Sequence, residues 1–446
     1  MNKETRSVSR SSVGGRRRVA SRMAVLLSVA TGVAGFAATG ASASSAPVTI
    51  KMFSGSGLAK VNQALATAFN KSQHGVKVVL LTVPDADYNT ALPRDLQSSA
   101  GPDVAAPAAL VQEVADHQLL NLNSYAKQYG WTKKFSKQAL APGRVNAHGV
   151  IGTNGSLYMA GGQAGVVTGI FYNRALLAKL NLTVPKTLAQ FGADLKAAKA
   201  AGITPIVASN ADGLTGHLFD MLLGDYMGAR KIDNVINNVP GSTVNTPGAV
   251  AAANQLASWM SAGYFNSDAN AIQQTQSYQE FGAGNGLFFI SGSWIESGGN
   301  FPASFQYGMM PFPPLHAGGP YSAMESNALA FAISAKSKHQ AQAAEFLNWL
   351  GSRKAAKVYV KVGGGNALGL AKITAPSLSA SLTKQTENIY QLVQKDNGVL
   401  NWLQNQGTTV NADYPPQLQL LMAGKTTGSA LIQKLESDVQ ADRQAA

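Results

Sequence analysis

Short apolar runs and amphipathic stretches alternate along most of the chain. Residues 76–83 form a nearly continuous apolar run, which is typical of a strand buried on both faces of a sheet. Similar runs predict further strands at 48–53, 103–106, 166–172, 203–207, 287–290 and 328–333. Helical periodicity between these runs predicts, among others, helices over 85–99, 187–200 and 340–360. This alternation of strands and helices predicts an α/β fold.

One predicted helix start carries its own capping signal. Thr187-Leu-Ala-Gln190 follows Pro185 and has the capping-box pattern, in which the Thr and Gln side chains each accept a hydrogen bond from the other residue's backbone N–H. The predicted helix therefore begins just after Thr187.

Residues 1–43 have the pattern of a secretory signal peptide. Residues 1–22 hold seven Lys or Arg residues against Glu4 alone, and residues 23–38 are largely apolar. That apolar run is shorter than the about 20 residues that span a bilayer. Ala41-Ser42-Ala43 supplies the small-x-small pattern, so we expect cleavage after Ala43. An uncleaved anchor helix is the alternative, and Arg17-Arg18 leaves the twin-arginine export route open.

Much of the positive charge lies in this N-terminal segment. The 446-residue chain has a formal net charge of +13, of which residues 1–22 contribute +6. Only 13% of the residues are charged, against about 25% in an average domain, and no basic run follows. This distribution argues against nucleic-acid binding. The lack of cysteine excludes disulfides, thiolate chemistry and lipid attachment through a cysteine, so we do not expect a lipoprotein.

No familiar catalytic or metal-binding motif is complete in the sequence. Gly-x-Ser-x-Gly, His-Glu-x-x-His and Gly-x-Gly-x-x-Gly do not occur. The stretch that begins Asp85-Ala-Asp87 has Leu96 where a calcium loop needs a carboxylate, and the six histidines show no ligand spacing. We therefore predict no catalytic residue, metal site or cofactor, and expect the histidines to be surface or structural residues.

Ordered short motifs run through nearly the whole chain after the signal peptide. They include Phe53-Ser-Gly-Ser-Gly57, Ser99-Ala-Gly-Pro-Asp-Val104, Gly155-Ser-Leu-Tyr158, Gly169-Ile-Phe-Tyr-Asn173, Gly202-Ile-Thr-Pro205, Ile290-Ser-Gly-Ser-Trp294 and Ala344-Glu-Phe-Leu-Asn-Trp349. In this order, behind an export signal, they give a sequence that resembles the extracellular carbohydrate-binding proteins of ABC importers, the maltose-binding-protein-like family.

The resemblance implies a two-lobed periplasmic-binding-protein fold of type II, with a cleft between two α/β lobes that move as a hinge. Three crossovers would join the lobes, near Gly162–Val167, Met309–Pro313 and Val362–Ala367. Lobe 1 would comprise 44–163 plus 312–362, and lobe 2 would comprise 164–311 plus 363–446. The resemblance also implies a monomeric protein that captures a sugar in the cleft and delivers it to a membrane permease.

Sugar sites combine an aromatic platform with planar polar side chains, because sugars present flat C–H faces and rings of hydroxyls. Trp294 matches the stacking tryptophan of the family, with core packing as its alternative. Glu296 is expected to accept hydrogen bonds from ligand hydroxyls, or else to be a solvated loop acid. Trp402, near Gln404 and Asn405, is the candidate for a second platform. Packing roles are expected for the tryptophans in helix-like surroundings, Trp131, Trp259 and Trp349.

The remaining candidate ligand-binding residues are polar side chains in predicted loops and turns. Ser54 and Ser56 follow the first strand, at the edge where open α/β sheets bind ligands, although Ser56 could instead cap the next helix. Asp87 could bind sugar or favour the start of its helix. The other candidates are Tyr88, Gln163, Asn210 and Glu325.

Two other functions remain compatible with the sequence, a secreted glycosidase and a binder of a different polar solute. The carboxylates are too scattered to nominate a glycosidase pair. An anion or amino-acid binder would need arginines in its cleft, and no arginine after the signal peptide lies in a motif that we place there. A neutral, hydroxyl-rich ligand is therefore favoured.

Overall fold

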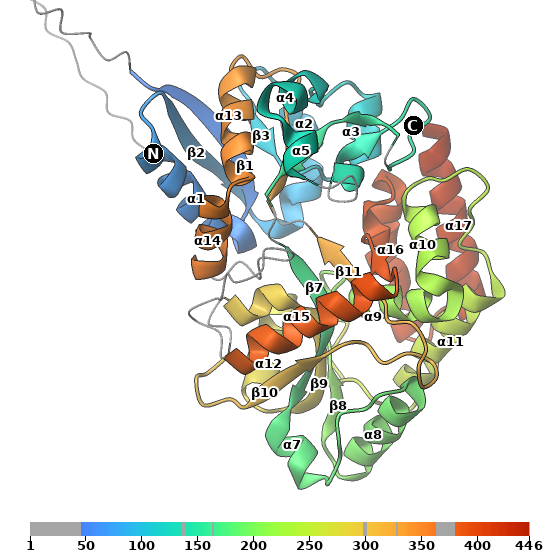
Figure 1. The fold of residues 1–446 in the computed structure, drawn as a ribbon. Helices are drawn as coiled ribbons and strands as arrows, with labels where there is room; N and C mark the ends of the chain where they lie inside the picture. The colour runs from blue at the N-terminus through green and yellow to red at the C-terminus, as the bar shows by residue number, and fades with distance from the viewer. Residues whose placement is uncertain are drawn as a thin grey trace, which may run out of the picture. The chain divides into compact units, whose positions relative to one another are not determined.

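The computed structural model describes residues 46–135, 140–152, 154–162, 165–297, 301–326, 329–362 and 380–445. The predicted signal peptide, Gln163 and most of the predicted third crossover lie outside the described residues. The described residues build two large sheets, which are separate from each other (Figure 1), and a small two-stranded sheet.

The first sheet has five strands in the order β2-β1-β3-β12-β6. These are β1 (Val48–Gly55), β2 (Val76–Val83), β3 (Val104–Ala105), β12 (Ala330–Ile333) and β6 (Met159–Gly161). The first three are parallel, whereas β12 runs antiparallel to both of its neighbours. Helix α1 (Ala59–Ser72) packs against β1 and β2, α13 (Gln340–Leu350) packs against β1, β12 and β6, and α14 (Arg353–Val362) lies against α1 (Figure 1).

The second sheet is built around β7, with the path β13-β11-β7-β9-β8 and with β10 also paired to β7. Its strands are β7 (Val166–Asn173), β8 (Thr204–Val207), β9 (Gly286–Gly292), β10 (Tyr307–Met310), β11 (Ala323–Ser326) and β13 (Val399–Leu400). Its core contains Phe191, whose ring lies 4.8 Å from that of Phe288 and 6.3 Å from that of Phe312. The first sheet has a core of its own around Phe69 and Trp131. Each sheet therefore has an independent apolar core.

Further helices cover these sheets and their edges. Those near the first sheet are α2 (Tyr88–Leu96), α3 (Leu110–Ala115), α4 (Asn123–Tyr129) and α5 (Trp131–Lys134), with a small hairpin of β4 (Arg144–Val145) and β5 (Ser156–Leu157). The second group is α7 (Arg174–Lys179), α8 (Leu188–Ala200), α9 (Gly216–Leu223), α10 (Ala229–Ile236), α11 (Pro247–Ser261), α12 (Gln274–Gly282), α15 (Ala380–Lys395), α16 (Thr408–Met422) and α17 (Gly428–Ala445). Among the described residues, none of the helices has the length and apolar character needed to cross a bilayer.

The predicted α/β fold is confirmed, but two local predictions were wrong. Strand β2 is an edge strand with Lys77 and Thr82 exposed, so it is not buried on both faces. The predicted helix 340–360 is two helices, because Gly351 ends α13 and the Ser352 hydroxyl accepts a hydrogen bond from the Ala355 N–H at 3.2 Å to start α14.

The predicted cap of α8 forms on one side only. The Thr187 hydroxyl accepts the Gln190 N–H at 3.2 Å, whereas the Gln190 side chain accepts the N–H of Lys186.

The structure moves one predicted boundary between the lobes. We expected a crossover at Met309–Pro313, with residues 312–362 in lobe 1. Instead β10 and β11 both pair with β7, and Phe312 is buried in the core of the second sheet. The chain therefore passes to the first sheet only after Ser326, because Phe312, Ala323 and Met324 are buried in the cores beside the second sheet and β11 pairs within that sheet. The chain also passes from β6 of the first sheet to β7 of the second between Gly161 and Val166.

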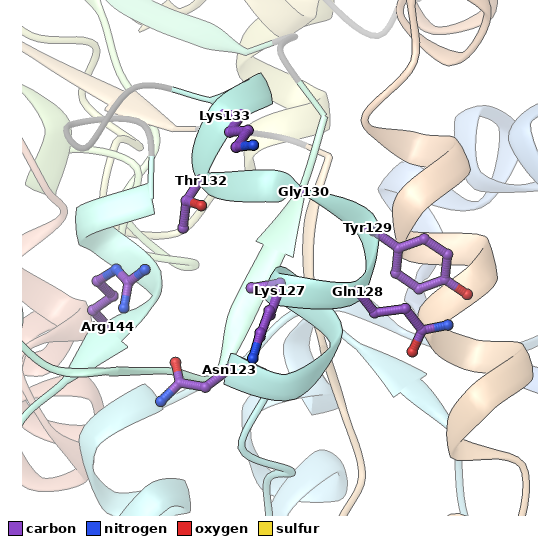
Figure 2. A pocket seen from close by; sticks show the side chains of 9 residues that line it. Asn123, Lys127, Gln128, Tyr129, Gly130, Thr132, Lys133 and Arg144 are labelled. Carbon is purple, nitrogen blue, oxygen red and sulfur yellow. The ribbon is translucent and has the colours of Figure 1, made fainter.

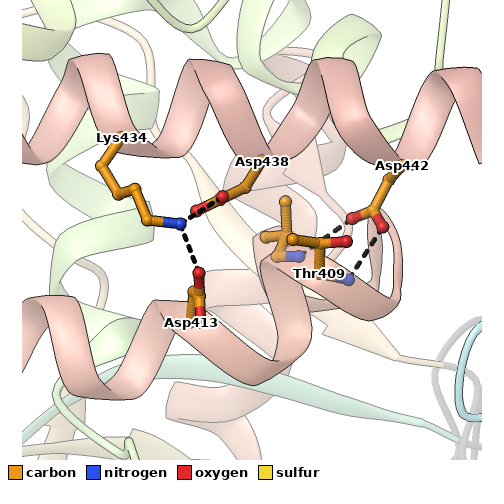
Figure 3. A network of polar contacts seen from close by, with 6 residues as sticks. Thr409, Asp413, Lys434, Asp438 and Asp442 are labelled. Atoms are coloured by element: carbon orange, nitrogen blue, oxygen red, sulfur yellow. Dashed lines mark hydrogen bonds and ion pairs between the residues drawn. The ribbon is translucent and has the colours of Figure 1, made fainter.

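A polar network joins α16 to α17 (Figure 3). The Asp442 carboxylate on α17 is 5% exposed, and it accepts the N–H groups of Thr409 at 2.8 Å and Val410 at 2.9 Å at the start of α16. A side chain at Gly407 would collide with this carboxylate, since an added Cβ would lie 2.2 Å from Asp442 Cγ. Farther along the pair of helices, Lys434 contacts Asp413 and Asp438. Asp442 thus caps α16 from a different helix.

A buried acid lies in the turn that follows α9. The chain widens there into a π-helix, η4 (Gly224–Gly228), which begins Gly224-Asp225. Asp225 Oδ2 is buried and has no hydrogen-bond partner among the described residues. Burial raises the pKa of Asp225 to about 8, because the charged form is poorly solvated.

Replacing Asp442 with Ala should destabilise the fold. The change leaves two helix-start N–H groups without an acceptor, so we expect the free energy of unfolding to fall by about 1–3 kcal/mol in urea titrations. Gln444→Ala, an exposed position on the same helix, is the control and should change little. Equal effects of the two substitutions would show that the cap contributes nothing.

Replacing Asp225 with Asn should stabilise the protein at high pH. The folded state holds a proton on Asp225 up to about pH 8, whereas the unfolded state releases it near pH 4, so this residue's stabilising contribution is lost as pH rises through that window. Asp225→Asn should therefore raise Tm at pH 8 and have a smaller effect at pH 5. Glu387→Gln removes a charge at an exposed position and should not show this pH dependence. An identical Tm gain at both pH values would contradict the assignment.

Candidate functional site

Four rings from distant parts of the sequence meet beside the second sheet. Trp294 lies in the short helix η5 (Ser293–Ser297) after β9, and Trp402 immediately precedes η6 (Leu403–Asn405). Their ring centroids are 5.8 Å apart with an interplanar angle of 46°. His217 of α9 contacts both indoles, with centroid distances of 5.5 Å to Trp294 and 4.4 Å to Trp402. Tyr278 of α12 completes the group, which we call the aromatic cluster.

The end of β9 fixes Trp294. A Cβ added to Gly292 would lie 1.7 Å from Trp294 Cζ3, so the indole lies against the backbone of Gly292 and requires glycine there. The Trp294 Nε1–H donates to the Tyr278 hydroxyl at 2.9 Å. Burial raises the pKa of Tyr278, so its hydroxyl stays un-ionised at neutral pH. Trp294 is half-buried and takes part in the core only at its rim.

Trp402 is fixed by its neighbours in the chain. The Leu403 N–H donates to Asp220 Oδ2 at 3.3 Å, and the Tyr414 hydroxyl donates to Asp220 Oδ1 at 2.5 Å. Asp220 is on α9, one helical turn after His217, and burial raises its pKa to about 7. One helix thus supplies both a ring of the aromatic cluster and the anchor for the segment that carries Trp402.

Ser54 and Ser56, which were predicted to bind ligand at the end of β1, make hydrogen bonds within the protein. Ser54 is buried; its hydroxyl donates to the Gly55 carbonyl and accepts from Asn62. Ser56 donates to Asp85 Oδ2 at 3.2 Å, and the same oxygen accepts the Gly57 N–H at 2.8 Å. Asp85, which we did not predict as a site residue, therefore organises this exposed turn in place of Ser56.

Two other predicted residues are held by contacts within the protein. The Tyr88 hydroxyl donates to the Ala106 carbonyl at 2.8 Å, and its ring lies 5.1 Å from that of Phe53. Asn210 is fully buried; its side-chain N–H donates to Asn270 Oδ1 at 2.9 Å, its backbone carbonyl accepts from Gln419, and its Oδ1 has no hydrogen-bond partner among the described residues. These bonds give both side chains a role in the fold.

The remaining candidates divide between exposed and undescribed positions. Asp87 is exposed at the start of α2. Gln163 and the side chains of Glu296 and Glu325 lie outside the described residues.

Two interactions connect the end of the first sheet with elements of the second. The Asn89 amide donates to Asn411 Oδ1 on α16 at 3.1 Å. The charge of Asp85 contributes, after burial and the charge of Asp212, to the raised pKa of Tyr278. The Asn89–Asn411 hydrogen bond brings the start of α2, just after the turn of Ser56 and Asp85, against α16.

A surface hollow of about 640 Å³ lies elsewhere, on α4 and α5 (Figure 2). Its lining is mostly polar and includes Lys127, Lys133 and Arg144. Its one aromatic side chain, Tyr129, is stacked on Trp131 at 5.8 Å. Unlike the hollow, the aromatic cluster combines buried polar groups with the ring faces that recognise a ligand, so we place the candidate site at the cluster. In the described part of the chain, no three His, Asp or Glu side chains are grouped to hold a metal.

Several solved structures have the same fold as this chain. A chitin oligosaccharide binding protein aligns with a TM-score of 0.71 at 18% identity, covering 86% of this chain and 95% of its own. The solute-binding protein RafE in complex with raffinose gives 0.68 at 19% identity, with coverages of 89% and 100%. Maltose-bound MalE3 of T. maritima gives 0.68 at 17% identity, with coverages of 88% and 99%. These likenesses confirm the predicted two-lobed fold of the maltose-binding type. A search of curated protein sequences finds no match.

A match to a family model identifies the protein family of this chain. Residues 55–357 match the model of the bacterial extracellular solute-binding proteins, which is more than half of the chain. The predictions of an exported protein and of a binding protein rather than an enzyme are confirmed by this match. With its two sheets, its separate cores and this matching segment, the chain belongs to the bacterial extracellular solute-binding protein family.

Proposed function

We propose that this protein captures a sugar or an oligosaccharide outside the cell and delivers it to the permease of an ABC transporter. The observation that carries the proposal is the pair of half-buried indoles, Trp294 and Trp402, held 5.8 Å apart beside neutral polar groups. Proteins of the same fold are described as binding a chitin oligosaccharide, raffinose and maltose.

The chemistry of the aromatic cluster suits a neutral ligand. Indole faces pack against the C–H faces of a sugar ring and exclude water from them. His217 and Tyr278 are both uncharged at neutral pH, because burial lowers the pKa of His217 to about 3 and raises that of Tyr278. Uncharged donors and acceptors can bond hydroxyls without the cost of burying an unpaired charge.

We place the ligand between the lobes, with the aromatic cluster on one side and the turn of Ser56 and Asp85 on the other. Asp85 and the exposed Asp87 offer carboxylates that accept hydrogen bonds from sugar hydroxyls. In the revised division, lobe 1 holds residues 46–161 and 330–362, and lobe 2 holds 166–326 and 380–445. Separate cores support this division, since each lobe can then rotate as a rigid body.

The same proposal covers how the protein is exported, whether it carries a lipid anchor, and how it meets the permease. The basic and apolar N-terminal pattern supports a signal peptide cleaved after Ala43, and the lack of cysteine supports a mature protein without a lipid anchor. We propose that the mature protein acts as a monomer and docks on the permease in its ligand-bound form.

The first test is calorimetry with purified protein and a panel of maltose, raffinose and tri-N-acetylchitotriose. Trp294→Ala should raise Kd on the order of 10- to 100-fold for the sugar that binds best, since burying an indole is worth about 1.5–3 kcal/mol. Trp349→Ala removes a half-buried indole from the core of the first sheet and should leave Kd unchanged. Unchanged affinity in Trp294→Ala would reject the platform, and turnover of the sugar would point to an enzyme.

The second test is small-angle scattering with and without the sugar that binds best. A ligand that contacts both lobes favours the closed state by its differential affinity, so the radius of gyration should fall at saturating sugar. Trp294→Ala binds less sugar at the same concentration, so its radius of gyration should fall by less than that of the wild type. A radius of gyration that stays constant in the wild type would contradict closure about the crossovers.

A further inference from the structure

Helix α9 is apolar apart from two side chains, His217 and Asp220. All eight of its residues are buried. Asp220 has a partner for each carboxylate oxygen, Tyr414 for one and the Leu403 N–H for the other. His217 differs, because its Nδ1 is buried and has no hydrogen-bond partner among the described residues.

The His217 ring lies next to the two candidate platforms, the indoles of Trp294 and Trp402. His217 is 9% exposed, and its ring lies at interplanar angles of 79° to the indole of Trp294 and 62° to that of Trp402, with ring centroids 5.5 and 4.4 Å away. The imidazole therefore contacts both candidate platforms. A ligand that stacks on either indole would come within reach of the imidazole.

An unpartnered buried nitrogen is costly. Leaving a buried polar group without a hydrogen bond destabilises the fold, and an apolar side chain of similar shape would avoid that loss. Packing alone would be served as well by Phe or Leu at this position. A histidine at this position is explained if its nitrogen forms a hydrogen bond with the ligand, which is made only when the ligand is bound.

We propose that His217 contacts the ligand directly and that its imidazole forms a hydrogen bond with a hydroxyl of the sugar bound against Trp294 and Trp402. This inference rests on the proposed function and assigns a specificity residue within its site. A neutral imidazole offers one N–H donor and one acceptor, and so matches a hydroxyl, which can both donate and accept. The low pKa of His217 keeps the ring neutral throughout the physiological range.

His217→Phe and His217→Leu test the proposal, since both retain apolar bulk and remove the nitrogens. We expect Kd for the best-bound sugar of the panel to rise about tenfold, with Tm equal to or above that of the wild type. His217→Asn places a polar atom near the position of Nδ1 and should recover part of the affinity that His217→Phe loses. His316→Phe, the same change at an exposed position, should alter neither quantity.

The outcomes separate this inference from the proposed function. Wild-type protein that binds a sugar with the same Kd as correctly folded His217→Phe and His217→Leu would overturn the role of His217 and leave sugar binding intact. A lower Tm with unchanged Kd in the folded fraction would assign His217 to packing and would also overturn it. Wild-type protein that binds none of the three sugars would remove the basis of both proposals.

Discussion

Asp220 is the group on which the candidate site most depends. Its two carboxylate oxygens accept from the Tyr414 hydroxyl and the Leu403 N–H, and so tie α9 to α16 and to the segment that carries Trp402. A carboxylate in an apolar helix is stable only with such partners, since a lone buried charge is expensive. Because one turn of the same helix presents His217 to both indoles, the anchor and the site form one rigid unit.

The second constraint is the division of the apolar interior. Each sheet has its own core, and the described helices mostly pack on one sheet or the other. A protein with two independent cores can change the angle between them without exposing either, which is the physical requirement for closing on a ligand. The segment 312–326 illustrates the rule, since it stays with the second sheet, where Phe312 is buried, until the chain crosses after Ser326.

The aromatic cluster combines rigidity with neutral polarity. Trp294 is held by the backbone of Gly292 and by Tyr278, so its ring is positioned before any ligand arrives. Prior positioning lowers the entropy lost on binding and raises affinity for a ligand of matching shape. The lining of the hollow on α4 and α5 has no comparable pair of aromatic faces.

The sequence by itself determined the fold class, most strand positions and the family, because apolar periodicity and short motifs are local properties of the chain. Only the tertiary structure decided that β2 is an edge strand, since an apolar run does not say what covers it. The roles of polar side chains were likewise decided by the tertiary structure. Ser54 and Asn210 were predicted from their places at the ends of strands, yet both make hydrogen bonds within the fold. His217 and Asp85 carry no local signal, because their partners are brought close only by folding, and burial by distant residues then fixes the charge of His217.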